Sequence, residues 1–219
     1  MQVEIWSDVV CPWCYIGKRR FERALASFEH ADEVDVVWRS FQLDPTAPAG
    51  GQDGDALVAK YGMSPERAAQ VRSDVTTTAA ADGLEYHLGS ERNPNTFDAH
   101  RLIHLAASKG LGDVAEERLF AANFTERANV GDPDTLVRLL ADIGIDADET
   151  RAVLASDTYA AEVRHDLSEA RALGATGVPF FVLDRAIGVS GAQSSDLLTD
   201  ALRQAWAAGR EIQPTSPSR

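Results

Sequence analysis

The stretch Val3–Lys18 reads VEIWSDVVCPWCYIGK. Its apolar start, VEIW, is typical of a short strand, and the Ser-Asp pair that follows predicts a turn. From Pro12 onward, apolar side chains recur on one face of a helix. Cys11 therefore comes immediately before the first helical turn, and Cys14 lies inside it. Proline is well suited to a first helical position, because its missing N–H would have no partner there.

Two cysteines at this spacing predict redox chemistry. The free N–H groups and the positive end of the dipole at a helix N-terminus stabilise an anion, so we expect the Cys11 thiol to ionise more readily than a free thiol. Cys14, one turn along, faces the same side and can form a disulfide with Cys11. We predict that Cys11 is the nucleophile and that Cys14 is the resolving thiol, which releases a mixed disulfide.

Two other interpretations of the cysteine pair stay open. A structural disulfide across so short a loop would stabilise little, because the entropic benefit grows with loop length. A zinc site would need two further ligands, and the chain has only these two cysteines. A C-x-x-C at a strand-to-helix junction favours the redox interpretation over both.

Composition narrows the class of protein. The 219 residues include 21 Lys and Arg against 34 Asp and Glu, a formal net charge of −13, which argues against nucleic acid or an anionic membrane as partner. No apolar run reaches the length of about 18 residues that a membrane span needs. The sequence enters a strand directly, without the pattern of a signal peptide, and has no disulfide framework. These features predict a cytoplasmic protein.

The rest of the chain shows the organisation of the fold. Residues 34–43 alternate and are rich in β-branched side chains, which predicts a second strand, parallel to the first and reached by a right-handed crossover. Residues 44–51 are a loop by composition. Helical patterns then follow one another from residue 55 to residue 174, with a long one over residues 148–173 that can be broken near residues 156–157.

Strand character returns over residues 177–183 and 186–189, and a last helix starts at Ser194 or Ser195. The pattern predicts an α/β domain formed by residues 1–50 and 175–210 and interrupted by an all-helical insertion, residues 51–174. The tail, residues 211–219, is expected to be disordered.

Three stretches together resemble the DsbA-like thioredoxin-fold oxidoreductases, and in particular their FrnE branch. They are DVVCPWCYIG at residues 8–17, NTFDAHR at residues 95–101 and VPFFV at residues 178–182. The likeness covers nearly the whole chain except the tail. It implies a thioredoxin fold with a helical insertion and an enzyme that exchanges thiols and disulfides with polypeptide substrates.

The resemblance also implies that Pro179 follows a cis peptide bond and packs beside the cysteine pair. A proline at the start of a strand cannot donate a ladder hydrogen bond. The backbone of Val178 would then be free to pair with an extended substrate chain. A proline that merely begins an edge strand is the alternative.

Further residues are expected near the substrate. Pro12 and Trp13 lie between the cysteines, where Trp13 offers an aromatic platform without charge. Asn95 and His100 belong to a stretch that carries the resemblance and are expected to border the cleft. His100 and His104 are four apart on one helix, but no third ligand is evident, so we predict surface or cleft histidines and no metal site.

Charged residues beside the motif give two further expectations. Lys18 and Arg19 follow Cys14 closely and are expected on a solvated helix face. Asp8 stands three residues before Cys11 and would oppose its ionisation if the two are close.

Two rival functions stay open. The FrnE branch is related to kappa-class glutathione transferases and 2-hydroxychromene-2-carboxylate isomerases, which typically carry another residue at the position of Cys11 and bind glutathione there. No bound cofactor is predicted, but glutathione is a possible co-substrate. The rivals are a glutathione-dependent isomerase or transferase, and a non-catalytic chaperone module that binds polypeptides.

Overall fold

The computed structural model describes residues 1–51, 58, 62–89 and 93–211 of the chain. Its four strands are β1 (Gln2–Ser7), β2 (Asp35–Ser40), β3 (Phe180–Leu183) and β4 (Ile187–Ser190). Its helices are α1 (Pro12–Ala26), the 3-10 helix η1 (Ala31–Glu33), α3 (Pro65–Ala81), α4 (Phe97–Ala107), α5 (Gly112–Phe124), α6 (Pro133–Asp142), α7 (Ala147–Leu154), α8 (Ala160–Ala172) and α9 (Ser195–Glu211).

The four strands form one mixed sheet in the order β2-β1-β3-β4. The strands β1 and β2 pair in parallel, as predicted, and β3 is antiparallel to both of its neighbours. The predicted strands over residues 34–43 and 177–183 are too long. The strand β2 ends at Ser40 because β1, its partner, ends at Ser7 and turns toward the cysteines. The strand β3 begins only after Pro179, which has no N–H to donate to the ladder.

The helices α3 to α8 all lie between β2 and β3 in the sequence, as the interrupted pattern predicts. The predicted break in the helix over residues 148–173 is confirmed, since Tyr159 takes a left-handed conformation between α7 and α8. The boundaries of the two domains stay a prediction. Of the tail over residues 211–219, only Glu211 belongs to the described part of the chain, as the last residue of α9.

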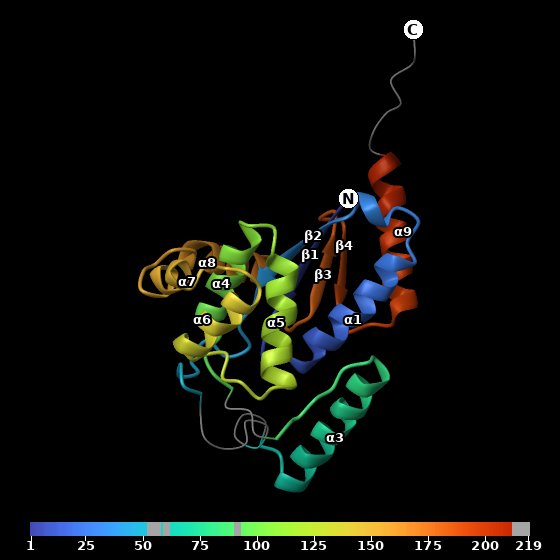
Figure 1. Ribbon diagram of the computed structural model, residues 1–219. Helices are drawn as coiled ribbons and strands as arrows, with labels where there is room; N and C mark the ends of the chain where they lie inside the picture. Colours follow the sequence, from blue (N-terminus) through green and yellow to red (C-terminus); the bar gives the residue numbers. More distant parts are fainter. Residues whose placement is uncertain (52–57, 59–61, 90–92, 212–219) are drawn as a thin grey trace.

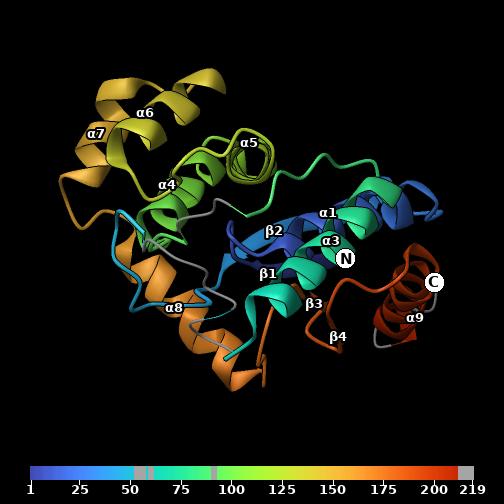
Figure 2. The same cartoon turned by 90° about the horizontal axis from the view of Figure 1, so that it is seen from below.

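The elements are arranged around the sheet in two groups. Figure 1 shows α4 to α8 on the side of β2, and α1 and α9 on the side of β4; Figure 2 shows the same separation from below. The helix α3 lies apart from both groups, near the start of α1. The N-terminus of α1, where the cysteines lie, is therefore bordered by the sheet, α5 and α3.

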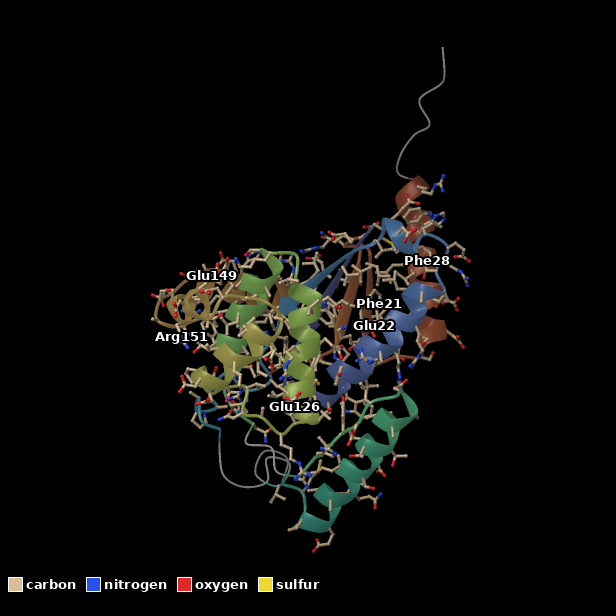
Figure 3. The ribbon with its side chains drawn as sticks, viewed as in Figure 1. Phe21, Glu22, Phe28, Glu126, Glu149 and Arg151 are labelled. Carbon is tan, nitrogen blue, oxygen red and sulfur yellow. The ribbon has the colours of Figure 1, made fainter. Side chains whose placement is uncertain are left out.

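The helix α1 is anchored along its length by aromatic side chains. Phe21 packs on Phe181 of β3, with ring centroids 5.6 Å apart, and Phe28 contacts Trp206 of α9 at 5.9 Å. Figure 3 labels Phe21 on this helix and Phe28, two residues past its end. Each buried phenylalanine contributes about 1.5–3 kcal/mol by leaving water. The packing fixes the direction in which α1 presents its first turn.

A buried carboxylate joins the sheet to the helices of the insertion. Asp166 of α8 accepts hydrogen bonds from Ser40 N at 2.9 Å, from Arg39 Nη1 at 3.2 Å and from His104 Nε2 at 3.0 Å. Its carbonyl oxygen also accepts the indole N–H of Trp6 at 2.9 Å. Burial would raise the pKa of Asp166, but the hydrogen bond from His104 and its other partners lower it. Strands β1 and β2 are thereby connected to α4 and α8.

Within the described ranges, no helix has the length and apolar composition needed to cross a membrane.

Candidate active site

The cysteine pair lies at the N-terminus of α1, as predicted. Cys11 is the N-cap residue and Pro12 the first residue of the helix. The Cys11 N–H donates to Asp8 O at 2.9 Å, and the Cys14 N–H donates to Cys11 O at 3.0 Å. Both side chains are buried, and both are free thiols. The turn after β1 therefore brings the two sulfur atoms together under a helix N-terminus.

The surroundings of Cys14 favour the neutral thiol. Burial raises the pKa of Cys14 well above its ordinary value, and the neighbouring Cys11 raises it further. A backbone hydrogen bond from Asp8 and the nearby Ser7 hydroxyl act in the opposite direction and lower the pKa. Ser7 Oγ is itself buried and has no well-formed hydrogen bond to any residue that the structure describes. Cys14 is thus held as a protonated thiol with donors ready for a thiolate.

The loop before β3 closes the site on the other side. The Val178–Pro179 peptide bond is cis, as the resemblance implies. The Cys11 thiol donates to Val178 O at 3.5 Å, so the backbone expected to receive a substrate chain faces the predicted nucleophile. A Cβ added to Gly17 would lie 2.8 Å from Pro179 Cγ. Only glycine allows α1 to approach the proline this closely.

Aromatic side chains line the site between α1 and α5. Tyr86 donates from its hydroxyl to Pro12 O at 2.7 Å and stacks on Phe124 at 4.7 Å between ring centroids. Tyr15 stacks on Phe120 at 4.9 Å. Burial raises the pKa of both tyrosines, so both remain protonated donors. The segment after α3 is tied to the redox turn by these contacts.

The predicted substrate contacts fall into two groups. Trp13 is 42% exposed beside the buried cysteines, where a substrate chain can reach it. Pro12 is partly buried, and its carbonyl oxygen accepts a hydrogen bond from the Tyr86 hydroxyl. His100 is buried, with Nε2 3.6 Å from Asp8 Oδ1, which excludes the surface position among the surface and cleft positions expected of it. It reaches the site from behind, because α4 packs against the turn after β1.

Asn95 has internal partners for both ends of its amide. Its Oδ1 accepts from Gln42 Nε2 at 3.0 Å and from Phe97 N at 2.9 Å, and its Nδ2 donates to Pro45 O and Ala47 O, each at 3.1 Å. These bonds join the loop after β2 to the start of α4. Its contact with substrate, like that of His100, stays a prediction.

The prediction that Lys18 lies on a solvated helix face is wrong. This side chain is 2% exposed and pairs with Glu22, with Asp113 at 3.1 Å and with Glu117 at 3.3 Å. Burial alone would lower the pKa of Lys18, but the hydrogen bond to Glu22 and the other carboxylates raise it. The sequence could not reveal this, because α5 supplies two of the three acids from about a hundred residues further along the chain.

Glu116 of α5 is a buried acid that the sequence interpretation missed. It is 1% exposed, and its Oε2 has no hydrogen-bond partner within the described part of the chain. Burial raises the pKa of Glu116 to about 8; Lys18 lowers it, and Asp8 and Asp113 raise it. The available signal was its place three and four residues before Leu119 and Phe120, two apolar residues on the same side of α5.

Two other chemistries lack a suitable geometry. Ser40, His104 and Asp166 have the composition of a hydrolase triad, but both hydroxyl and carboxylate contact the same nitrogen, Nε2. A triad needs one nitrogen for each partner. In residues 1–51, 58, 62–89 and 93–211, no group of three or more His, Cys, Asp or Glu side chains is arranged to hold a metal ion.

Comparison with known families agrees with this geometry. A profile of the family described as DSBA-like thioredoxin domain matches residues 2–203. The chain belongs to the DSBA-like thioredoxin domain family. The predicted thioredoxin fold with a helical insertion of the DsbA-like type is therefore confirmed. Placement of this DsbA-like chain in the FrnE branch stays a prediction.

Solved structures give the same fold. A probable DsbA oxidoreductase from Streptomyces coelicolor is 49% identical, with a TM-score of 0.89 over 100% of this chain and 93% of that one. A 2-hydroxychromene-2-carboxylate isomerase matches with 14% identity and a TM-score of 0.69, over 97% and 100% of the two chains. The cytosolic disulfide reductase DsbM from Pseudomonas aeruginosa matches with 16% identity and a TM-score of 0.63, over 97% and 100%. At such low identity the last two show the DsbA-like fold alone.

Proposed function

We propose that this chain is a thiol–disulfide oxidoreductase whose redox centre is the pair Cys11 and Cys14, with polypeptide thiols or disulfides as substrates. The observation that carries the proposal is the unequal environment of the two thiols. Cys11 caps α1 and faces the loop at Val178, whereas Cys14 is buried behind it and held as a thiol. An attacking thiol and a resolving thiol need this division of roles.

In the reducing direction, the Cys11 thiolate attacks one sulfur of a substrate disulfide. The substrate S–S bond breaks, its other sulfur leaves as a thiolate and takes a proton, and a mixed disulfide with Cys11 forms. Cys14 then loses its proton and attacks Cys11 Sγ. The second substrate thiol leaves, the Cys11–Cys14 disulfide forms, and two electrons have passed to the substrate.

In the oxidising direction, the same steps run backward from the Cys11–Cys14 disulfide. A substrate thiolate attacks Cys11 Sγ, and Cys14 leaves as a thiolate that its burial converts to a thiol. A second substrate thiolate then attacks the substrate sulfur of the mixed disulfide and releases Cys11. The reduction potential of the pair, relative to that of its partner couple, decides the net direction among oxidase, reductase and isomerase.

Two solved relatives support the proposal. The Streptomyces coelicolor protein, similar at 49% identity, is named a probable DsbA oxidoreductase. DsbM is named a cytosolic disulfide reductase and has also been solved with GSH. We therefore propose glutathione as a co-substrate that reduces or forms a mixed disulfide with Cys11. The cytoplasmic location stays a prediction, and it would place the pair against a reducing glutathione pool.

The presence of both cysteines favours exchange over the glutathione-dependent isomerase. An isomerase that only activates glutathione needs one residue at the position of Cys11 and no resolving thiol. Here Cys14 lies beside Cys11 and is affected electrostatically by it. The Cys14→Ser variant separates the two functions, because exchange would stop at the mixed disulfide while an isomerase would keep its turnover.

Thiol trapping in glutathione redox buffers tests the proposal. The chain has only two cysteines, so alkylation with a maleimide of known mass reports this pair without background. We expect one two-electron transition between no label and two labels, and loss of insulin disulfide reduction in Cys11→Ala. Cys14→Ser should accumulate one glutathione, or one substrate chain, on Cys11.

Exposed positions supply the control. Asp148→Asn changes a side chain that is 91% exposed on α7 and should leave the transition and the turnover unchanged. A pair that stays fully labelled, or fully unlabelled, at every glutathione ratio would contradict the proposal. Suppression of aggregation without any disulfide turnover, equal in wild type and Cys11→Ala, would support the chaperone alternative instead.

A further inference from the structure

Asp8 occupies a central position behind the cysteine pair. Its carbonyl oxygen accepts the Cys11 N–H at 2.9 Å, and its own N–H hydrogen-bonds toward Cys14. Its carboxylate is buried and accepts the Leu43 N–H at 2.7 Å, beyond the end of β2. The same residue therefore holds the backbone of the redox turn and carries a buried carboxyl group three residues before Cys11.

His100 of α4 is the partner that faces this carboxylate. It is 1% exposed, and its Nε2 lies 3.6 Å from Asp8 Oδ1. Across the described part of the molecule, this nitrogen has no hydrogen-bond partner. A buried imidazole nitrogen without a partner destabilises the folded state. Movement of a few tenths of an ångström toward Asp8 would satisfy it.

We propose that Asp8 and His100 are positioning residues that set the reduction potential of the Cys11–Cys14 pair, with His100 moderating the charge of Asp8. This inference rests on the proposed function. It assigns to the insertion a part in the redox chemistry, because His100 comes from α4 and Asp8 from the turn after β1.

The sign of the effect follows from electrostatics. A thiolate forms in the reduced pair and is absent from the disulfide, so a nearby negative carboxylate disfavours the reduced state. An N–H donor on that carboxylate weakens this repulsion. Removing the charge of Asp8 should therefore favour the dithiol, and removing the donor of His100 should favour the disulfide.

One further titratable group interacts with Asp8. Glu116 of α5 interacts electrostatically with Asp8, Lys18 and Asp113. Lys18 of α1 is already paired with carboxylates at distances up to 3.3 Å. The backbone N–H groups of Leu43 and Val10 donate to the Asp8 carboxylate at 2.7 and 3.5 Å, and His100 is the side chain that faces it, at 3.6 Å.

The experiment measures the equilibrium constant of the pair with glutathione by thiol trapping in four proteins: wild type, Asp8→Asn, His100→Leu and the double variant. Asp8→Asn keeps the shape and the acceptor for Leu43 N, and should shift the constant about tenfold toward the dithiol, which is about 30 mV. His100→Leu should shift it severalfold toward the disulfide. In the double variant the His100 substitution should have no further effect.

Controls separate this inference from folding and from the proposed function. Asp148→Asn makes the same chemical change at an exposed position and should leave the constant unchanged. His100→Gln restores an N–H donor and should return the constant toward that of wild type, even if His100→Leu folds poorly. A normal wild-type transition with an unchanged constant in Asp8→Asn, or an equal His100→Leu shift with and without Asp8, would overturn the inference. No wild-type transition at all would overturn the proposed function instead.

Discussion

Two buried carboxyl groups of the insertion, on α8 and on α5, illustrate how partners decide the state of an acid. Asp166 of α8 and Glu116 of α5 are equally inaccessible to water. Asp166 has three donors, and they lower its pKa despite burial. Glu116 has an oxygen without a hydrogen-bond partner among the described residues, and burial, together with the nearby acids Asp8 and Asp113, raises its pKa to about 8.

The difference separates a structural region from a chemical one. The Asp166 cluster joins strands to helices, and each carboxylate oxygen of Asp166 accepts a hydrogen bond. The region around Glu116, Ser7 and His100 contains buried polar atoms that have no hydrogen-bond partner in the described part of the chain, and it lies behind the cysteines. Buried polar groups in native structures are nearly always paired, so a concentration of exceptions points to function.

The largest effect is expected from Asp166→Ala, which removes the carboxylate that joins strands to helices. It leaves Arg39 and His104 without this buried partner and should lower the free energy of unfolding by about 3–5 kcal/mol. Urea unfolding measures it. Asp148→Ala, at an exposed ion pair on α7, is the control and should change stability by less than about 0.5 kcal/mol. Similar losses in the two variants would contradict the assignment.

A smaller effect is expected from Gly17→Ala, which disturbs the packing of α1 on Pro179, beside the cysteine pair, without changing a charge. Alanine normally stabilises a helix relative to glycine by up to about 1 kcal/mol. Here its Cβ would meet the ring of Pro179, so we expect a loss of about 1–3 kcal/mol and slower disulfide turnover. Gly209→Ala in α9 has ordinary contacts and should be neutral or stabilising. If both alanine variants are more stable than wild type in urea unfolding, Pro179 moves away from the added methyl group at little energetic cost.

The smallest effect, taken over the single unit between pH 6 and pH 7, is the pH dependence of stability from Glu116. Because its pKa is raised when folded, the folded protein binds more protons than the unfolded chain between about pH 5 and pH 8. The free energy of unfolding should therefore fall as pH rises, by about 1.4 kcal/mol per unit from this group. The lowered pKa of Asp166 gives the opposite slope, only in more acidic solution, where its stabilisation is lost as pH falls.

The variant Glu116→Gln isolates the contribution of Glu116 to the pH dependence of the free energy of unfolding. It should remove the fall between pH 6 and pH 7 and be more stable than wild type above pH 8, as measured by urea unfolding at each pH. Glu162→Gln, an exposed position on α8, is the matched control and should keep the wild-type slope. An identical slope in wild type and Glu116→Gln would show that Glu116 is ionised throughout.

The sequence by itself determined the strands, the crossover helix and the place of the cysteines. These features depend on local causes: apolar periodicity, a proline at the first helical position and turn residues. The break near Tyr159 and the interruption of the sheet by helices were also predictable. Residue spacing therefore sufficed to place Cys11 and Cys14 under a helix N-terminus.

Only the tertiary structure decided the surroundings of that pair. Lys18 has a polar sequence neighbourhood, yet α5 covers it and supplies its acids. Glu116 and His100 come from helices about a hundred residues after the cysteines and reach the redox turn from behind. Desolvation and pairing depend on contacts between segments that are distant in the chain. No local pattern encodes them, which is why the motif was predictable and its electrostatics were not.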